Sequence, residues 1–194
     1  MKIEVIERRR SIRRFKEDAV PAEMIVQILE AARQAPSAKN AQPWRFLVLG
    51  AQSRAIALDA MDAGIRRRME TAEHRKLLAD TIHTLRIMRH VPALMLIVNP
   101  TGGNPTDGIS GLARVAELLD AMSVGAAVEN LLLEAAALGL GALWIGNTFF
   151  AYDEITSALG IQGHLLGAIA LGWPDEAPEP RPRKPMAETA AFLP

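Results

Sequence analysis

The sequence of 194 residues contains no cysteine. Disulfides, thiolate nucleophiles, CxxC redox centres and iron–sulfur ligation are therefore excluded. The sequence also has no GxSxG, no HExxH and no P-loop, and its four histidines lack the spacing of metal ligands. We expect no metal site and no catalytic side chain of these kinds. An enzyme with this composition must take its chemistry from a cofactor.

Net charge, aromatic residues and long apolar runs are also scarce. The 22 basic and 22 acidic side chains cancel, and there is a single tyrosine for stacking on bases. The longest apolar run, residues 135–146, is shorter than the roughly 20 residues of a membrane-spanning helix. The first ten residues lack the apolar core of a signal peptide. We therefore expect a soluble protein without nucleic-acid or membrane partners, and the lack of cysteine favours a cytoplasmic location.

Hydrophobic periodicity predicts helices and strands that interleave along the chain. Helices are expected over residues 19–35, 112–138 and 153–159, and over a long region, 51–90, that divides in two near Thr71. Strands are expected over residues 45–49, 93–98, 142–145 and 165–171. The run 93–98 is apolar throughout, which is typical of a strand covered on both faces.

Two glycine- or proline-rich segments interrupt these elements. Residues 99–111 hold four glycines and two prolines and are predicted to form a loop. From residue 175 onward the chain is rich in proline and lacks periodicity. We predict one α+β domain over residues 1–174 and an extended C-terminal arm over residues 175–194 that belongs to it.

A cationic segment lies near the start of the chain. Residues 8–16 place six cations among nine residues without a carboxylate. Their mutual repulsion favours an anion at this place. A solvated basic face and a nucleic-acid patch are the alternatives, and the zero net charge argues against the second. Arginine forks and the Ser11 hydroxyl are well suited to a small phosphate.

Two further segments are candidates for ligand contacts. Residues 36–44 form a short polar loop between two prolines, and its amides and hydroxyls suit a heterocycle with alternating donors and acceptors. A plain surface turn is the alternative. Residues 139–147 contain a GxG, but it follows a helix and opens a strand, which is the reverse of a dinucleotide-binding fingerprint. Gly146 at the strand end would let backbone approach a flat ligand.

Four motifs in order resemble the nitroreductase family of FMN enzymes: RRSIRRF, AxxAPSAKNAQPWRF, ENLLLEAAALGLGALWIG and RPRKP. The resemblance implies a homodimer with FMN at the subunit interface. It further implies a central mixed sheet of about four to five strands flanked by helices, and a C-terminal arm exchanged between subunits. The helix around residues 124–138 would pack in the dimer interface.

The resemblance also implies a set of cofactor contacts. The phosphate, ribityl chain and pyrimidine edge of FMN would be held by Arg9, Arg10, Ser11 and Arg13, and the phosphate also by Arg181 and Arg183. Along the ring, the partner subunit would supply Pro36, Ser37, Lys39, Asn40 and Gln42. Against one face of the ring would lie Trp144, Ile145 and Gly146, with a backbone amide near Gly146 directed at N5.

By the same resemblance, NAD(P)H would pass a hydride to flavin N5, and a nitroaromatic, quinone or similar small aromatic acceptor would then take two electrons in a ping-pong sequence. A fixed cation near N1 and the C2 carbonyl favours the reduced flavin, and Arg13 is our candidate. The stretch 82–90 lacks an asparagine that larger family members carry, and the loop 99–111 could shape the substrate opening as a lid. The choice between NADH and NADPH and the acceptor stay open. Two alternative functions also stay open. One is a specialised family member that fragments flavin, dehalogenates or carries out a natural-product dehydrogenation, and the other is a flavin-binding module without turnover.

Overall fold

Four strands form one sheet in the computed structural model, which describes residues 3–70, 72–104 and 107–193. The strands are β1 (Arg45–Val48), β2 (Ala93–Asn99), β3 (Gly141–Ile145) and β4 (His164–Gly172), and they lie in the order β1-β2-β4-β3. Each of the three ladders is antiparallel. We expected a mixed sheet. The long crossover from β2 to β3 does make these two strands parallel to each other, but β4 inserts between them.

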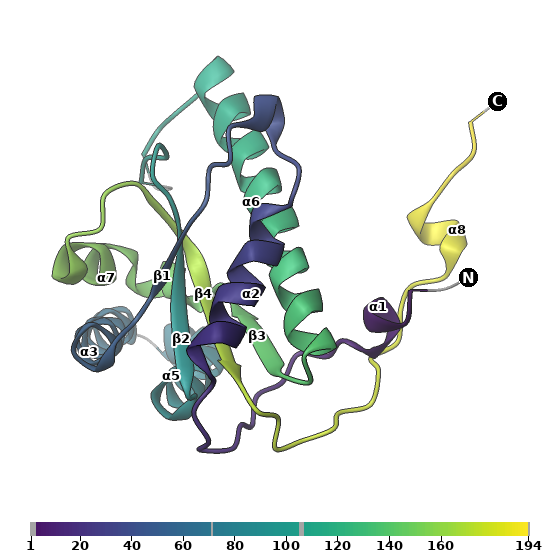
Figure 1. Ribbon diagram of the computed structural model, residues 1–194. Helices are drawn as coiled ribbons and strands as arrows, with labels where there is room; N and C mark the ends of the chain where they lie inside the picture. Colours follow the sequence, from purple (N-terminus) through teal and green to yellow (C-terminus); the bar gives the residue numbers. More distant parts are fainter. Residues whose placement is uncertain (1–2, 71, 105–106, 194) are drawn as a thin grey trace.

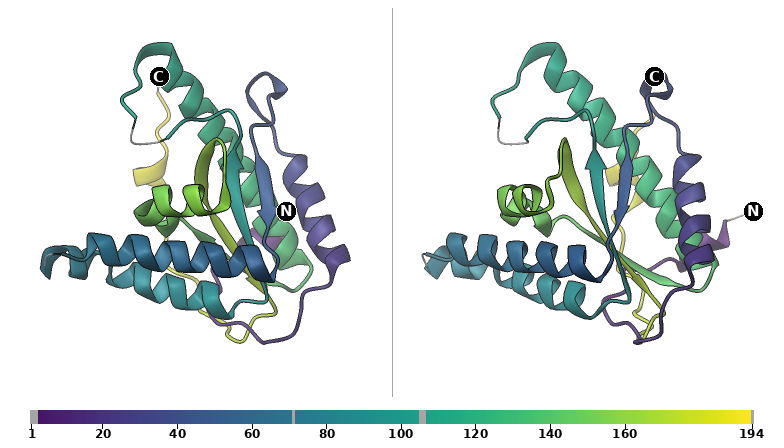
Figure 2. Two further views of the ribbon diagram at one scale, coloured as in Figure 1. Left: turned by 90° about the vertical axis from the view of Figure 1, so that its left-hand side faces the viewer. Right: turned by 60° about the vertical axis from the view of Figure 1, so that its left-hand side comes forward.

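Helices cover both faces of the sheet (Figure 1, Figure 2). One face carries α2 (Ala22–Arg33) and α6 (Gly111–Ala137). The other carries α3 (Ala51–Arg68), α5 (Ala79–His90) and α7 (Tyr152–Leu159). The remaining elements are short: α1 (Glu4–Arg8), η1 (Ala38–Asn40), α4 (Ala72–Leu77), η2 (Asn147–Ala151) and α8 (Met186–Thr189). The α+β fold class is therefore confirmed.

The β2 strand explains why two core layers form. All seven of its residues are buried. Leu94, Leu96 and Val98 pack into the core under α3, α5 and α7, while Met95 and Ile97 pack into the core under α2 and α6. Successive side chains of a strand point to opposite faces, so an uninterrupted apolar run fills both layers. The prediction of a strand covered on both faces is confirmed.

The helices differ from the expectation in one detail. The region 51–90 divides into α3, α4 and α5 rather than two helices, and Thr71 lies outside the described residues. For the second half of α6, packing in a dimer interface stays a prediction. Its apolar residues pack in the chain's own core, among them Val124, Val128 and Leu131. The exposed apolar side chains belong instead to its first half: Leu112, Val115, Leu118, Leu119 and Met122.

The N-terminal segment runs along the edge of the sheet before α2 begins. The amide of Ile12 donates to the carbonyl oxygen of Ala142 in β3 (3.0 Å), and the amide of Lys16 donates to that of Trp173 (2.9 Å). The Ile12 side chain is buried over Gly141, where a Cβ atom would lie 2.9 Å from Ile12. A glycine at 141 is therefore what lets this segment lie against β3.

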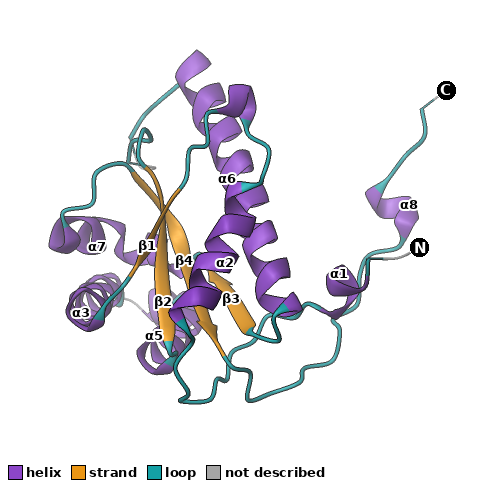
Figure 3. Cartoon of the chain, in the orientation of Figure 1, coloured by secondary structure: helices purple, strands orange, loops and turns teal. Residues whose placement is uncertain are grey.

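The chain beyond β4 leaves the body of the molecule as an extended strap that carries only the short helix α8 (Figure 3). Residues 177–193 are exposed. Among the described residues, no helix combines the length and the apolar character needed to cross a membrane.

Gly141→Ala should destabilise the fold by about 1–3 kcal/mol, because the added methyl group overlaps Ile12 in a packed layer. Urea unfolding monitored by circular dichroism measures this loss. Gly50→Ala is the matched control, since the described residues leave the space around its Cβ position open and its φ is −77°. Equal stability of the two variants would contradict the assigned contact.

Candidate functional site

Two distant parts of the chain meet in a cationic pocket of about 240 Å³. Its lining includes all six residues that the resemblance assigned to the phosphate, the ribityl chain and the pyrimidine edge. We call this set the arginine clamp: Arg9, Arg10, Ser11, Arg13, Arg181 and Arg183. Pro178 and Glu179 complete the lining. The clamp therefore forms within a single chain, and five guanidinium groups face it beside one carboxylate.

The N-terminal half of the clamp is fixed by contacts with the body of the protein. Ser11 pairs with Ala142 in a parallel β-bridge, so this stretch follows the β3 edge. Nε of Arg9 lies 3.2 Å from Oε1 of Glu129 on α6. Nη1 of Arg10 donates to the Glu7 carbonyl oxygen (2.6 Å), which turns this side chain back along α1. The guanidinium groups are thus held in place before any anion arrives.

The loop of residues 36–42 is strained and lies elsewhere. Lys39, Asn40 and Gln42 all have positive φ angles, between 48° and 55°. This left-handed region costs non-glycine residues roughly 1–2 kcal/mol each. Figure 1 shows the loop at the upper end of α2, whereas the strap leaves the sheet at its lower end. A single chain therefore does not bring Pro36, Ser37, Lys39, Asn40 and Gln42 to the arginine clamp.

Two serine hydroxyls hold this loop in its strained form. Ser37 Oγ accepts a hydrogen bond from the Gln42 amide (3.0 Å), and Ser123 Oγ accepts one from the Ala38 amide (3.3 Å). Ser123 belongs to α6 and is buried. Sequence reasoning missed Ser123, because a lone serine in an apolar helix carries no local signal of a contact 85 residues away.

The third predicted segment forms the last two residues of β3 and the glycine that follows. The Trp144 side chain is 45% exposed, whereas Ile145 is buried and could meet a ligand only through its backbone. Gly146 is exposed, and none of the described residues lies within 4 Å of the position of a Cβ. Its φ of −92° is open to any residue. The fold itself therefore does not require a glycine at this position.

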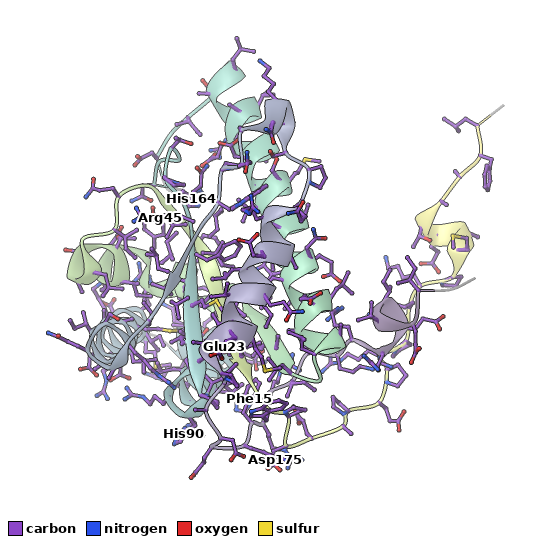
Figure 4. All side chains as sticks on the ribbon, in the orientation of Figure 1. Phe15, Glu23, Arg45, His90, His164 and Asp175 are labelled. Atoms are coloured by element: carbon purple, nitrogen blue, oxygen red, sulfur yellow. The ribbon has the colours of Figure 1, made fainter. Side chains whose placement is uncertain are left out.

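A second polar cluster lies at the opposite end of β4, where Figure 4 labels His164. Nδ1 of His164 lies 3.4 Å from Oε1 of Glu117, and the two side chains are 8% and 11% exposed. Nδ2 of Asn99 donates to Asp120 (3.1 Å) on the same side of α6. Glu117 also pairs with Arg114. This cluster ties the first half of α6 to the ends of β2 and β4.

Burial lowers the pKa of His164, and the negative charge of Glu117 opposes this shift in part. Nε2 of His164 has no hydrogen-bond partner among the described residues. The histidine is therefore neutral in the folded protein near neutral pH. In the described part of the chain, no group of three or more histidine, aspartate and glutamate side chains is arranged to hold a metal ion.

The loop that we considered as a lid is only partly described. Its residues 105–106 lie outside the described residues. Asn99 is the buried last residue of β2, and Gly111 is the first residue of α6. A role of this loop as a lid stays a prediction.

Comparisons with known proteins place these segments in context. The model of the nitroreductase family matches residues 6–173. The chain is 28% identical to YfhC of Bacillus subtilis, provisionally named an NAD(P)H nitroreductase, over 95% of this chain and 90% of that one. It is 29% identical to 5,6-dimethylbenzimidazole synthase of Rhodospirillum rubrum, over 87% and 79%. A provisionally named nitroreductase from Desulfovibrio desulfuricans, solved in complex with FMN, is 30% identical over 98% and 95% of the two chains, with a TM-score of 0.72.

Acid should destabilise this protein partly through His164. The unfolded histidine has its ordinary pKa of about 6.5 and binds a proton that the folded one resists. Stability is therefore lost as pH falls from about 6.5 toward the lower folded-state pKa. His164→Gln should lose less unfolding free energy than the wild type between about pH 7.5 and 5.5. Urea titrations at both pH values measure this, with the exposed His90→Gln as control. An identical loss in the wild type and His164→Gln would disprove the assignment.

Proposed function

The chain belongs to the nitroreductase family, and we propose that it is an FMN-dependent oxidoreductase that uses NAD(P)H to reduce a small aromatic acceptor such as a nitroaromatic or a quinone. The observation that carries this proposal is the arginine clamp, in which the two predicted phosphate-binding segments meet in one pocket.

The donor set of the clamp fits the phosphate of FMN. Guanidinium forks bind phosphate oxygens in pairs, and such charge-assisted bonds are about twice as strong as neutral ones. The Ser11 hydroxyl adds a donor of adjustable direction. The volume of about 240 Å³ is below the roughly 300–1,000 Å³ of pockets that enclose a whole small molecule. We assign only part of FMN to this pocket: the phosphate, the ribityl chain and the pyrimidine edge.

The ring of FMN needs contacts outside the clamp. Trp144 and Gly146 are exposed, and we assign one ring face to them and to the backbone of Ile145. We assign Arg13 to the pyrimidine edge, where a fixed cation favours the reduced form of the cofactor. When bound, FMN supplies the two-electron chemistry between NAD(P)H and the acceptor. The protein then needs to bind and orient FMN and its substrates and to shield them from water, and it needs no nucleophile of its own.

A homodimer would complete this site. The exposed apolar side chains in the first half of α6 form a surface that needs a cover. The strained loop of residues 36–42 presents Lys39, Asn40 and Gln42 to solvent at a distance from the chain's own clamp. Strain of this kind is typical of binding segments. We propose that the loop meets the ring held by the partner subunit, and that the C-terminal arm wraps around that subunit. A cytoplasmic location stays a prediction from the sequence.

A second candidate is fragmentation of the flavin itself. The similarity to 5,6-dimethylbenzimidazole synthase, at 29% identity, favours it. The two functions differ in the fate of the cofactor. A reductase returns FMN unchanged after many turnovers, whereas a fragmenting enzyme consumes reduced flavin in the presence of oxygen.

Reconstitution with FMN tests the function directly. The purified protein should retain the flavin absorbance bands, NADH or NADPH should bleach them, and a quinone should restore them with full recovery of FMN by chromatography. A protein that stays colourless, or a flavin that neither nucleotide bleaches, would refute the proposal. Loss of FMN with formation of a benzimidazole would favour the second candidate.

Arg13→Ala should weaken FMN binding by roughly 10- to 100-fold, because one charge-assisted contact is lost, and should lower the flavin reduction potential. Flavin fluorescence titration and a redox titration against a reference dye measure the two effects. Arg66→Ala is the control, since Arg66 is exposed on α3 and pairs there with Asp62 at 2.8 Å. Unchanged affinity and potential in Arg13→Ala would reject this role.

Gly146→Val should lower the affinity for FMN without lowering the stability of the apoprotein. The open space and ordinary φ at Gly146 predict a change of less than about 0.5 kcal/mol in the stability of the apoprotein. FMN affinity should fall by about tenfold or more, since the side chain would occupy the ring face. Gly50→Val is the matched control at another open glycine. Retained affinity would exclude Gly146 from the ring contacts.

A further inference from the structure

One carboxylate holds the C-terminal strap against the cationic segment. Glu176 Oε1 accepts hydrogen bonds from two successive backbone amides, those of Arg13 and Arg14, the second at 3.1 Å. Its Oε2 lies 3.5 Å from Nε of Arg14. The Glu176 side chain is only 19% exposed. Two amides and a guanidinium therefore converge on this one side chain at the point where the strap leaves the body.

Backbone pairing brings Glu176 to this position. The amide of Asp175 donates to the carbonyl oxygen of Arg14 (3.0 Å), and Phe15 forms an antiparallel bridge with Pro174. Figure 4 shows the labelled residues Phe15 and Asp175 together at the lower end of the sheet. The two chain segments thus run side by side up to Glu176. Beyond it, residues 177–193 are exposed.

The stretch after Glu176 is rich in proline and therefore stiff. Prolines at 178, 180 and 182 alternate with other residues up to Arg183. Proline fixes its own φ and disfavours the helical region for the residue before it, so such a stretch behaves as a semi-rigid extended spacer. Arg181 and Arg183 follow Glu176 by five and seven residues. The orientation set at Glu176 therefore decides whether these two arginines reach the pocket.

We propose that Glu176 is a positioning residue for phosphate binding: its grip on the amides of Arg13 and Arg14 orients the strap so that Arg181 and Arg183 close the arginine clamp. The inference rests on the proposed function, since the phosphate is that of FMN. It has an uncommon consequence. A carboxylate beside an anion site normally weakens anion binding through repulsion. Glu176 instead strengthens phosphate binding, because it orients the strap that carries Arg181 and Arg183.

The neighbouring Glu179 provides the opposite case. Glu179 lines the cationic pocket itself and is exposed. Its negative charge opposes a phosphate there. Glu176→Ala and Glu179→Ala remove the same charge from positions three residues apart. Simple electrostatics predicts tighter FMN binding in both variants, whereas the positioning role predicts opposite signs.

The experiment measures the dissociation constants of FMN and of riboflavin for the apoprotein by flavin fluorescence. Riboflavin binding is also measured by its competition with bound FMN. Riboflavin has the same ring and ribityl chain but no phosphate. Glu176→Ala should weaken FMN binding by about tenfold and leave riboflavin binding unchanged. Glu179→Ala should tighten FMN binding. Glu176→Gln keeps a carbonyl acceptor for the two amides and should fall between Glu176→Ala and the wild type.

Asp175→Ala is the matched control, because its exposed side chain is adjacent and its backbone bond to Arg14 is retained. FMN affinity in this variant should equal that of the wild type. Tighter or unchanged FMN binding in Glu176→Ala would overturn the inference. Equal losses of FMN and riboflavin affinity would also overturn it, because they would mean general damage to the site.

The wild type separates this inference from the proposed function. If the wild-type apoprotein does not bind FMN, or does not prefer it to riboflavin, the proposed function fails and the inference fails with it. If the wild type prefers FMN and Glu176→Ala retains that preference, the function stands and only the positioning role of Glu176 is rejected.

Discussion

The pairing of residues 11–16 with the sheet edge is the constraint on which the rest of the site depends. The segment bonds to β3 through Ile12 and to the chain beyond β4 through Lys16. These contacts place the cationic stretch beside the beginning of β3 and beside the start of the strap. The N-terminal segment thereby meets two parts of the chain that lie more than a hundred residues away from it in the sequence. Without this pairing, the arginines would be a solvated basic tail.

Charge compensation and proline stiffness both shape the arginine clamp. Five guanidinium groups at one pocket repel one another, and the protein counters this with Glu179 in the pocket lining and with two carboxylates outside it. Glu129 lies against Arg9, and Glu176 accepts from the backbone of Arg13 and Arg14. The proline-rich strap adds stiffness at low entropic cost, since proline has few conformations to lose. The pocket is thereby prepared for an anion that the fold does not itself supply.

The long helix α6 shows how one element serves two purposes. Its second half fills the core between α2 and the sheet. Its first half extends past the sheet end, holds the loop of residues 36–42 through Ser123, and ties β2 and β4 through Glu117 and Asp120. The polar contacts face the body, while apolar side chains face outward. Hydrophobicity alone does not distinguish a core from a surface that a partner subunit covers, and a place for the second half in a dimer interface stays a prediction.

The fold class and the strand positions, to within a residue, could be read from the sequence, because apolar periodicity and prolines at element ends are local signals. The clamp residues came from four motifs that resemble the nitroreductase family, and their contacts with FMN stay a prediction. Tertiary contacts were needed to show that β4 lies between β2 and β3, that Ser123 holds a distant loop, and that Glu176 binds the start of the strap. Such facts depend on pairings between residues far apart in the chain, and neither spacing nor composition encodes those pairings locally. The positive φ angles at Lys39, Asn40 and Gln42 belong to the same class, because side-chain chemistry permits that conformation but only tertiary contacts impose it.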